Sequence, residues 1–191
     1  PNWFAPEGVE TVDVYAMGRQ NWFSTVGDEH RHVREHVGIF DQSSFAKFEV
    51  KGKDAAAALE WICANRISKP VGSVVYTQML DRRGGVVADI TVTRLADDRF
   101  RVVTGAGVVD ADHGWLRMVA DDAGLARVAI DDRTDELAVI GSWGPAARAV
   151  LAAATGDDVS NEALPFYRSR ELAIGPATVL AQRITYVGEL G

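Results

Sequence analysis

The chain has 191 residues, of which 47% are hydrophobic, a formal net charge of −7 at pH 7 and a single cysteine. This length and apolar fraction are typical of one large domain or two small ones with a sizeable buried core. The acidic balance, without a basic tract, argues against nucleic acid as a partner, because its binding needs clustered Lys and Arg. No apolar run is long enough to span a membrane, and the lone Cys63 excludes an internal disulfide framework and suits the reducing cytoplasm.

The first 24 residues are rich in aromatic and turn-forming residues and keep no helical or strand period. We expect an irregular segment that packs through its rings against another surface. Further along, AKFEVKG (46–52) alternates apolar with charged residues, which is typical of a half-exposed strand.

Helical and alternating patterns follow one another along the rest of the chain. The sequence predicts helices over residues 26–37, 54–65 and 107–124, and a further helix that opens at Pro145. It predicts strands over residues 46–52, 73–80, 85–95, 99–105, 126–132, 135–141, 169–174 and 177–185. The segment DRRGG joins the second and third of these strands as a hairpin with Gly at the tight positions. Antiparallel strand pairs with helices between them indicate an α+β fold.

An acidic residue, Asp89, interrupts the strand predicted over residues 85–95. Apolar residues such as Ile90 fall on one face of this strand, and Asp89 shares the other face with Thr91. Asp is depleted in strands, and a carboxylate among apolar residues is costly unless it has a partner. One interpretation is structural: the carboxylate pairs with Arg94 or with solvent. The other is functional: Asp89 is held in a cleft and acts on a proton. Periodicity leaves both open.

The preceding strand bears on this choice through Tyr76. If the DRRGG hairpin sets Tyr76 opposite Asp89, the two side chains share a face. A one-residue slip places Thr77 there instead, and the sequence leaves this register open.

Other motifs are better explained by structure than by chemistry. The Gly105-x-Gly107 turn before a helix resembles a dinucleotide-binding start, but Asp110 occupies the third glycine position and would repel phosphate. His32 and His36 share a helix face, yet the sequence offers no third metal ligand of matching character nearby, so no metal site is predicted. Ser43 lacks the small-residue elbow of a nucleophile and is expected to form a turn.

Three stretches together resemble the folate-binding fold of the glycine cleavage T-protein. They are VREHVGIFDQSSFAKFEVKGKDAAAALEWICAN, VGSVVYTQMLDRRGGVVADITVTRL and ITYVGELG. The same fold forms the C-terminal part of flavin-dependent dimethylglycine and sarcosine oxidases and dehydrogenases. Ser43-Ser44-Phe45, in place of the usual Ser-His-Met, and the aromatic lead-in favour this flavin-linked branch.

The resemblance implies a domain organisation. Residues 26–191 correspond to the front part of a folate-binding, aminomethyltransferase-like domain, which would be incomplete at its C-terminus. Residues 1–25 correspond to a lead-in that follows a flavin domain missing from this chain. FAD is therefore expected only in a separate domain or subunit, and tetrahydrofolate is the cofactor expected here.

The resemblance also implies site residues. Asp89 matches the acidic residue near the reactive bridge nitrogen of tetrahydrofolate and would be the catalytic base or electrostatic partner. Tyr76 matches a tyrosine that lines the same pocket, and Glu189 matches the glutamate of YxGE that holds the pterin. Tyr186 and Arg183, on or near the same strand, are further folate-binding candidates.

The implied reaction is tetrahydrofolate-dependent one-carbon transfer. An iminium or formaldehyde equivalent, produced by oxidation of an N-methyl amine such as dimethylglycine or sarcosine, would be captured as 5,10-methylenetetrahydrofolate. The expected partners are folate, the one-carbon donor and a flavin domain or subunit. Two alternatives remain: an aminomethyltransferase or demethylase that uses another donor, and a non-catalytic or incomplete folate-binding module.

Overall fold

The computed structural model describes residue 3, residues 5–186 and residues 188–191. Its helices are α1 (Phe23–Glu35), α2 (Ala55–Ile62), α3 (Val109–Asp122) and α4 (Ala147–Ala154). Its strands are β1 (Gly38–Asp41), β2 (Ala46–Lys51), β3 (Val74–Leu80), β4 (Val86–Ala96), β5 (Arg99–Thr104), β6 (Ala129–Asp132), β7 (Ile140–Trp143), β8 (Arg168–Ile174) and β9 (Ala177–Arg183). The predicted α+β class is confirmed.

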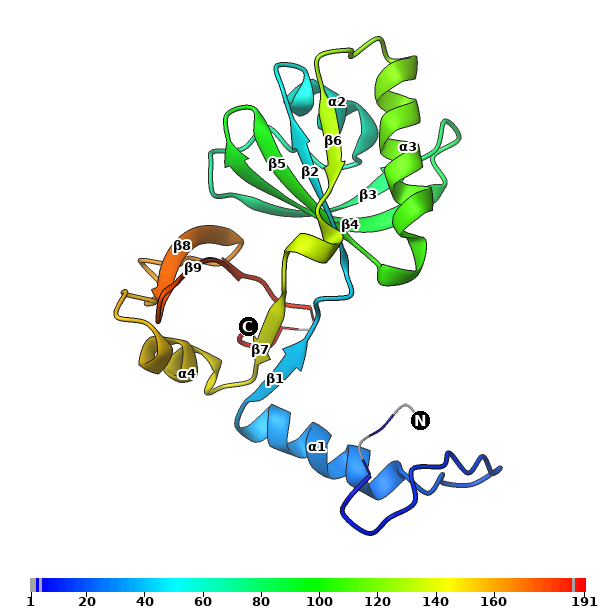
Figure 1. The fold of residues 1–191 in the computed structure, drawn as a ribbon, viewed down its shortest axis with the longest axis vertical. Helices are drawn as coiled ribbons and strands as arrows, with labels where there is room; N and C mark the ends of the chain where they lie inside the picture. The colour runs from blue at the N-terminus through cyan, green and yellow to red at the C-terminus, as the bar shows by residue number, and fades with distance from the viewer. Residues whose placement is uncertain (1–2, 4, 187) are drawn as a thin grey trace.

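The centre of the fold is a five-stranded antiparallel sheet with the order β3-β4-β5-β2-β6 (Figure 1). Helices α2 and α3 pack on one face of this sheet. There the alternating apolar residues of β2, β4 and β5 meet Leu59 of α2 and Leu116 of α3 in one buried cluster. The opposite face carries exposed polar side chains such as Asp89, and the segment after β6 covers it at one end.

Two smaller antiparallel ladders, β1-β7 and β8-β9, lie beside the central sheet (Figure 1). The β8-β9 hairpin is attached to the edge strand β3, because Ser73 and Arg168 form an antiparallel bridge. The chain ends among β7, α4, β8 and β9, where the Gly144 N–H donates to the Leu190 carbonyl at 2.9 Å. The C-terminal segment is therefore packed within the fold.

The β3-β4 hairpin has the turn that its sequence predicts. Asp81 accepts hydrogen bonds from the backbone N–H groups of Arg83 at 2.7 Å and Gly85 at 2.8 Å. Gly84 adopts a φ of 81°, in the left-handed region that favours glycine. The register shifts between Met79 and Leu80, which marks a β-bulge next to the turn.

Several predicted boundaries differ from the structure. The first helix begins at Phe23 and ends at Glu35, rather than spanning 26–37, and none of its residues is buried. Residues 134–136 form a short 3-10 helix and only residues 140–143 form a strand, where one strand over 135–141 was predicted. The ladder partner of this strand, β1, has only four residues and was not predicted.

Lys47 departs from the half-exposed face predicted for the strand over residues 46–52. Its side chain is only 1% exposed, and its ammonium group donates to the Ser43 carbonyl at 2.6 Å. Burial lowers the pKa of Lys47, because the charged form loses its hydration. The connection from β1 into β2 therefore covers a strand position that solvent was expected to reach.

Within the described part of the chain, no helix is both long and apolar enough to cross a membrane.

Candidate functional site

The register of the β3-β4 hairpin places Gln78 opposite Asp89 and Tyr76 opposite Thr91. Partners directly opposite each other in a ladder point to the same face, and so do residues two positions apart. All four side chains therefore lie on the face turned away from α2 and α3. Tyr76 is a diagonal neighbour of Asp89, so neither of the two predicted registers, with Tyr76 or Thr77 directly opposite, is the one observed.

Asp89 is an exposed carboxylate with two partners on β3. The Gln78 amide donates from Nε2 to Oδ1 of Asp89 at 3.2 Å. A hydrogen bond links the Tyr76 hydroxyl to the same carboxylate. This hydrogen bond, followed by burial and by the negative charge of Asp89, raises the pKa of Tyr76 above its ordinary value. Tyr76 thus stays protonated and serves as a donor over a wide pH range.

The structure also resolves the question of Arg94. Its guanidinium donates to the carbonyl oxygens of Lys69 at 2.6 Å, Ala96 at 3.2 Å and Asp97 at 2.9 Å. Arg94 therefore joins two loops through these carbonyl groups and does not neutralise Asp89. Of the two structural partners considered for Asp89, Arg94 and solvent, Arg94 is excluded. Among the described residues, the partners of the Asp89 carboxylate are the neutral side chains of Gln78 and Tyr76, which leaves its charge available to a ligand.

The strand β9 reaches the same face of the sheet. Gln182 donates from Nε2 to the Thr93 hydroxyl at 2.8 Å, and Thr93 is fully buried on β4. Because Thr93 and Asp89 share a face, this contact brings the C-terminal hairpin to the far end of the Asp89 face. The segment that follows β9 carries the remaining predicted folate-binding residues.

Tyr186 and Glu189 belong to one C-terminal loop. The Glu189 carboxylate accepts hydrogen bonds from the Thr185 hydroxyl at 3.0 Å and from the Tyr186 backbone N–H at 2.7 Å. Tyr186 is largely exposed, and its electrostatic effect reaches the Tyr76 hydroxyl, whose pKa it raises slightly further. The structure therefore connects Glu189 to Tyr186 by a hydrogen bond.

Arg183 makes its contacts away from Asp89 and Tyr76. It donates from Nη1 to Asn161 Oδ1 at 2.7 Å and to the Leu164 carbonyl at 3.2 Å, and its guanidinium lies 5.9 Å from the Phe166 ring centroid. These contacts join the end of β9 to the segment before β8. Within the described residues, Arg183 makes no hydrogen bond or ion pair with Asp89 or Tyr76.

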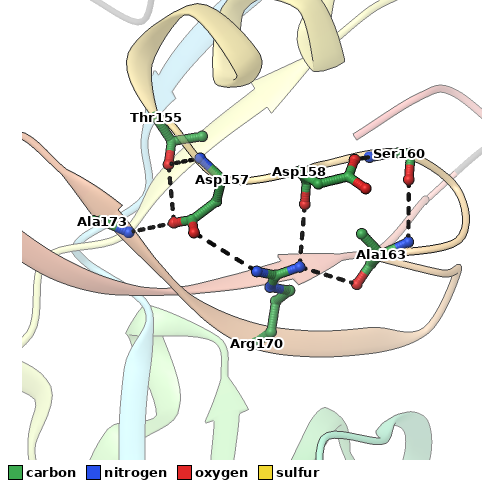
Figure 2. A network of polar contacts seen from close by, with 7 residues as sticks. All are labelled: Thr155, Asp157, Asp158, Ser160, Ala163, Arg170 and Ala173. Carbon is green, nitrogen blue, oxygen red and sulfur yellow. Dashed lines mark hydrogen bonds and ion pairs between the residues drawn. The ribbon is translucent and has the colours of Figure 1, made fainter.

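The loop between α4 and β8 is fixed to β8 by a polar network (Figure 2). Asp157 accepts from the Ala173 N–H at 2.9 Å and from the Thr155 hydroxyl at 3.2 Å, and its other oxygen lies 3.8 Å from the Arg170 guanidinium. Arg170 also donates to the Asp158 carbonyl at 3.1 Å. A cavity of about 520 Å³ lies beside this loop, but Asp157 and Asp158, which line it, are already hydrogen-bonded. The network therefore holds the β8-β9 hairpin in position.

The other motifs have structural roles. The Ser43 hydroxyl accepts from the Val139 N–H at 3.1 Å, which ties the β1-β2 connection to the start of β7. Asp110 and Asp112 occupy the first turn of α3, and Asp112 accepts from the Thr104 hydroxyl at 2.5 Å, so carboxylates stand where a phosphate would bind. In the described residues, no group of three or more His, Cys, Asp or Glu side chains is placed to hold a metal ion.

Sequence reasoning missed one member of the site, Gln78. Its place two residues after Tyr76 was a usable signal, because residues at this spacing share a strand face. The residue that stands opposite Asp89 depends on the bulge at the turn, which the sequence pattern did not reveal.

Comparisons with known proteins identify the family of the chain. The family described as GCVT N-terminal domain matches residues 1–191. The chain is 40% identical over 191 residues to the mitochondrial dimethylglycine dehydrogenase of Rattus norvegicus, an alignment that covers 100% of this chain and 22% of that protein. It is 38% identical over 190 residues to the 4-methylaminobutanoate oxidase (formaldehyde-forming) of Paenarthrobacter nicotinovorans, covering 100% of this chain and 23% of that enzyme.

A solved structure supports the same assignment. The glycine cleavage system aminomethyltransferase T from Bartonella henselae superposes with a TM-score of 0.68 and 31% identity, over 85% of this chain and 42% of that chain. The chain thus spans less than half of the length of each of these relatives. Since the family match runs along the whole sequence, the chain belongs to the GCVT N-terminal domain family, as its motifs predicted.

Proposed function

We propose that this chain binds tetrahydrofolate over the Asp89 face and supports capture of a one-carbon unit as methylenetetrahydrofolate. The observation that carries the proposal is an exposed carboxylate, Asp89, held by the Gln78 amide and the Tyr76 hydroxyl, with no neutralising cation in the part of the chain that the structure describes. A carboxylate held in this way can accept a proton from a nitrogen that becomes acidic as a new carbon bond forms.

The residues have distinct parts in this proposal. Gln78 and Tyr76 each donate to the Asp89 carboxylate and so use some of its oxygen lone pairs. The remaining lone pairs can accept hydrogen bonds from the ligand. Tetrahydrofolate supplies the nucleophilic nitrogen when it is bound. Holding it beside the one-carbon donor contributes to the rate by proximity.

We further propose that Glu189 binds the pterin edge, because a carboxylate can accept hydrogen bonds from two adjacent N–H donors. Its bonds to the Thr185 hydroxyl and the Tyr186 N–H support this role by keeping the carboxylate in a fixed orientation. Tyr186 remains a contact candidate beside Tyr76. Arg183 is proposed to act indirectly, by anchoring the strand that carries this loop.

The donor side of the reaction is proposed from the relatives. Dimethylglycine dehydrogenase and 4-methylaminobutanoate oxidase are oxidoreductases by name, so we propose that an FAD-containing domain or subunit generates the one-carbon unit. In this proposal, residues 1–25 connect to that flavin unit and residues 26–191 provide the folate-binding part. The mitochondrial location in the name of the rat relative argues against the cytoplasm as a general location for such chains.

The runner-up function is an aminomethyltransferase that receives its one-carbon unit from another donor. The similarity to the Bartonella henselae aminomethyltransferase favours it. Supplying formaldehyde or a lipoyl-bound aminomethyl group as alternative donors to the full-length protein separates the two functions.

The central experiment is the substitution Asp89→Asn in the full-length protein. It removes the proton acceptor but preserves shape, so we expect methylenetetrahydrofolate formation to fall at least about 100-fold while the protein stays folded. The matched control is Asp98→Asn, since Asp98 lies exposed in the β4-β5 turn and its carboxylate makes no hydrogen bond or ion pair among the described residues. Full product formation by the Asp89 variant contradicts the assigned role.

A further inference from the structure

A second cavity lies far from the Asp89 face, between the N-terminal segment and the first turn of α1. Its volume is about 200 Å³, and its lining among the described residues consists of Trp3, Asp13, Tyr15, Trp22 and Val26. Figure 1 shows the N-terminal segment folding beside α1, remote from the five-stranded sheet. Three of the five lining residues are aromatic, and one is a carboxylate.

The acidic side of this cavity is held in place by Asn21. Its Oδ1 accepts from the Val14 N–H at 3.0 Å, and its Nδ2 donates to the Val12 carbonyl at 2.8 Å. Asp13 stands between these two anchored residues, and Trp22 is the N-cap residue of α1. The hydrogen bonds of Asn21 therefore fix the backbone on both sides of Asp13.

Two polar atoms of the cavity lining are buried and have no hydrogen-bond partner among the residues that the structure describes. They are Nε1 of Trp3 and Oδ1 of Asp13. Trp3 is only 8% exposed. The other oxygen of Asp13 has only a long contact, 3.5 Å, with the Tyr15 hydroxyl. The guanidinium of Arg19 lies 4.5 Å from the Phe23 ring centroid, and within the described residues it makes no ion pair with Asp13. Buried polar atoms without partners are uncommon in folded proteins, so two of them in one small cavity call for an explanation, and a bound ligand is one.

The chemistry of the lining selects a particular kind of ligand. A carboxylate attracts a cation, and the faces of Trp and Tyr attract one through their negative electrostatic potential. A primary ammonium group needs three hydrogen-bond acceptors, more than this mainly aromatic lining offers. An N-methylated ammonium group instead presents methyl groups to the rings while it keeps its charge near Asp13. The free indole N–H of Trp3 can donate to an oxygen atom elsewhere in the same ligand.

We propose that this cavity is a binding site for a small N-methylated ammonium compound that also carries an oxygen acceptor. The site is separate from the Asp89 face, and its existence does not depend on the proposed one-carbon chemistry. Trp22 and Tyr15 supply the aromatic walls, Asp13 supplies the counter-charge, and Trp3 supplies one hydrogen-bond donor.

The test is a titration of the full-length protein with choline, followed by ligand-observed NMR. The comparison ligand is 3,3-dimethyl-1-butanol, which has the same shape without the charge. We expect choline to bind at least about fivefold more tightly than its neutral analogue, since cation–π attraction adds to apolar contact only for the charged ligand. Asp13→Asn and Trp22→Leu should each weaken choline binding by at least about fivefold.

A matched control is Trp61→Leu, because Trp61 is 71% exposed on α2 and lies outside the cavity lining. This variant should bind choline as the parent protein does, and circular dichroism should show the same fold for all variants. Equal binding of choline and its neutral analogue would mean that the cavity binds both ligands through apolar contact alone, and it would overturn the proposal. Undiminished choline binding by folded Asp13→Asn, or absence of choline binding by the parent protein, would overturn it as well.

Discussion

At the scale of single residues, the proposed activity depends on how the Asp89 carboxylate is oriented. Replacing Gln78 with Leu removes the donor that lies 3.2 Å from Oδ1, so the carboxylate can rotate away from the ligand. We expect kcat for one-carbon transfer to fall about tenfold with little change in KM, which is the result of losing orientation rather than binding. Steady-state kinetics of the full-length protein measures both quantities.

The control for this substitution is Gln182→Leu. Gln182 makes an equivalent amide-to-side-chain contact, 2.8 Å from the Thr93 hydroxyl, on the same face but away from Asp89. It should change stability more than kcat. If the two Leu variants lower kcat equally, Gln78 has no special role in orienting Asp89.

A second residue-scale prediction concerns Tyr76. The hydrogen bond to Asp89 is the largest cause that raises the pKa of Tyr76, and the charge of Asp89 adds to it. Asp89→Asn removes the charge and weakens the acceptor, so the pKa of Tyr76 should move down toward its ordinary value of about 10. NMR titration of ring-labelled tyrosine reports this directly. A pKa of Tyr76 that stays unchanged in the variant would mean that the two side chains do not interact in solution.

At the scale of elements, Gly144 determines how β7, α1 and α4 meet. It adopts a φ of 120°, and a Cβ atom there would lie 2.5 Å from the Val33 carbonyl oxygen and 2.6 Å from that of His36. Because both neighbours are backbone atoms at the end of α1, they cannot move aside as a flexible side chain would. Gly144→Ala should therefore lower the free energy of unfolding by about 2 kcal/mol or more.

Urea denaturation of the two alanine variants, Gly144→Ala and Gly156→Ala, provides the measurement and its control. A Cβ atom at Gly156 meets no atom within 4 Å, so this variant should change stability by less than about 0.5 kcal/mol. Equal midpoints for the two variants would show that the contact between α1 and the β7-α4 turn is not rigid.

At the scale of the whole molecule, depressed carboxyl pKa values make the fold sensitive to acid. The guanidinium of Arg127 lowers the pKa of Asp54, chiefly by a side-chain hydrogen bond, and the Ala173 N–H lowers the pKa of Asp157. Other carboxyl groups shifted in the same direction by hydrogen bonds are Asp41, Asp132 and Asp158. These groups stabilise the fold when they are ionised, so their contribution is complete above the unfolded-state pKa of about 4.

We therefore expect the free energy of unfolding to fall as the pH drops below about 4, through the folded-state pKa values of these groups. Urea midpoints measured over this range check the prediction. Asp54→Asn should make the decline shallower, because the variant has lost one of the groups that take up a proton. A midpoint independent of pH in this range would contradict the hydrogen bonds assigned to these carboxylates.

Much of the architecture is predictable from local pattern. The hairpin of β3 and β4, the strand β5 and the last strand pair fall within two residues of their predicted bounds, because alternation and Gly-containing turns are local signals. The short strands β1 and β7 could not be predicted in the same way. Each has four residues, and they form a ladder only because the chain returns about 100 residues later to pair with itself.

Lys47 shows the same limit at a single position. Its alternation with Phe48 predicts an exposed side chain, and it does lie on the face opposite the core. It is buried because the β1-β2 connection and the segment after β6 cover this end of the sheet, where Lys47 N–H donates to the Thr134 hydroxyl at 3.1 Å. Periodicity identifies the face of a strand, but it does not show what packs on that face.

The sequence by itself determined the α+β class, the family resemblance, and the position of Asp89 on the strand face opposite its apolar residues. Only the tertiary structure decided that Gln78 stands opposite Asp89, that Tyr76 is its diagonal neighbour, and that Arg183 is engaged elsewhere. The physical reason is that a strand pattern repeats every two residues. A register shift by two leaves every side chain on its predicted face while it changes which partner stands opposite, and the bulge beside the turn makes that choice.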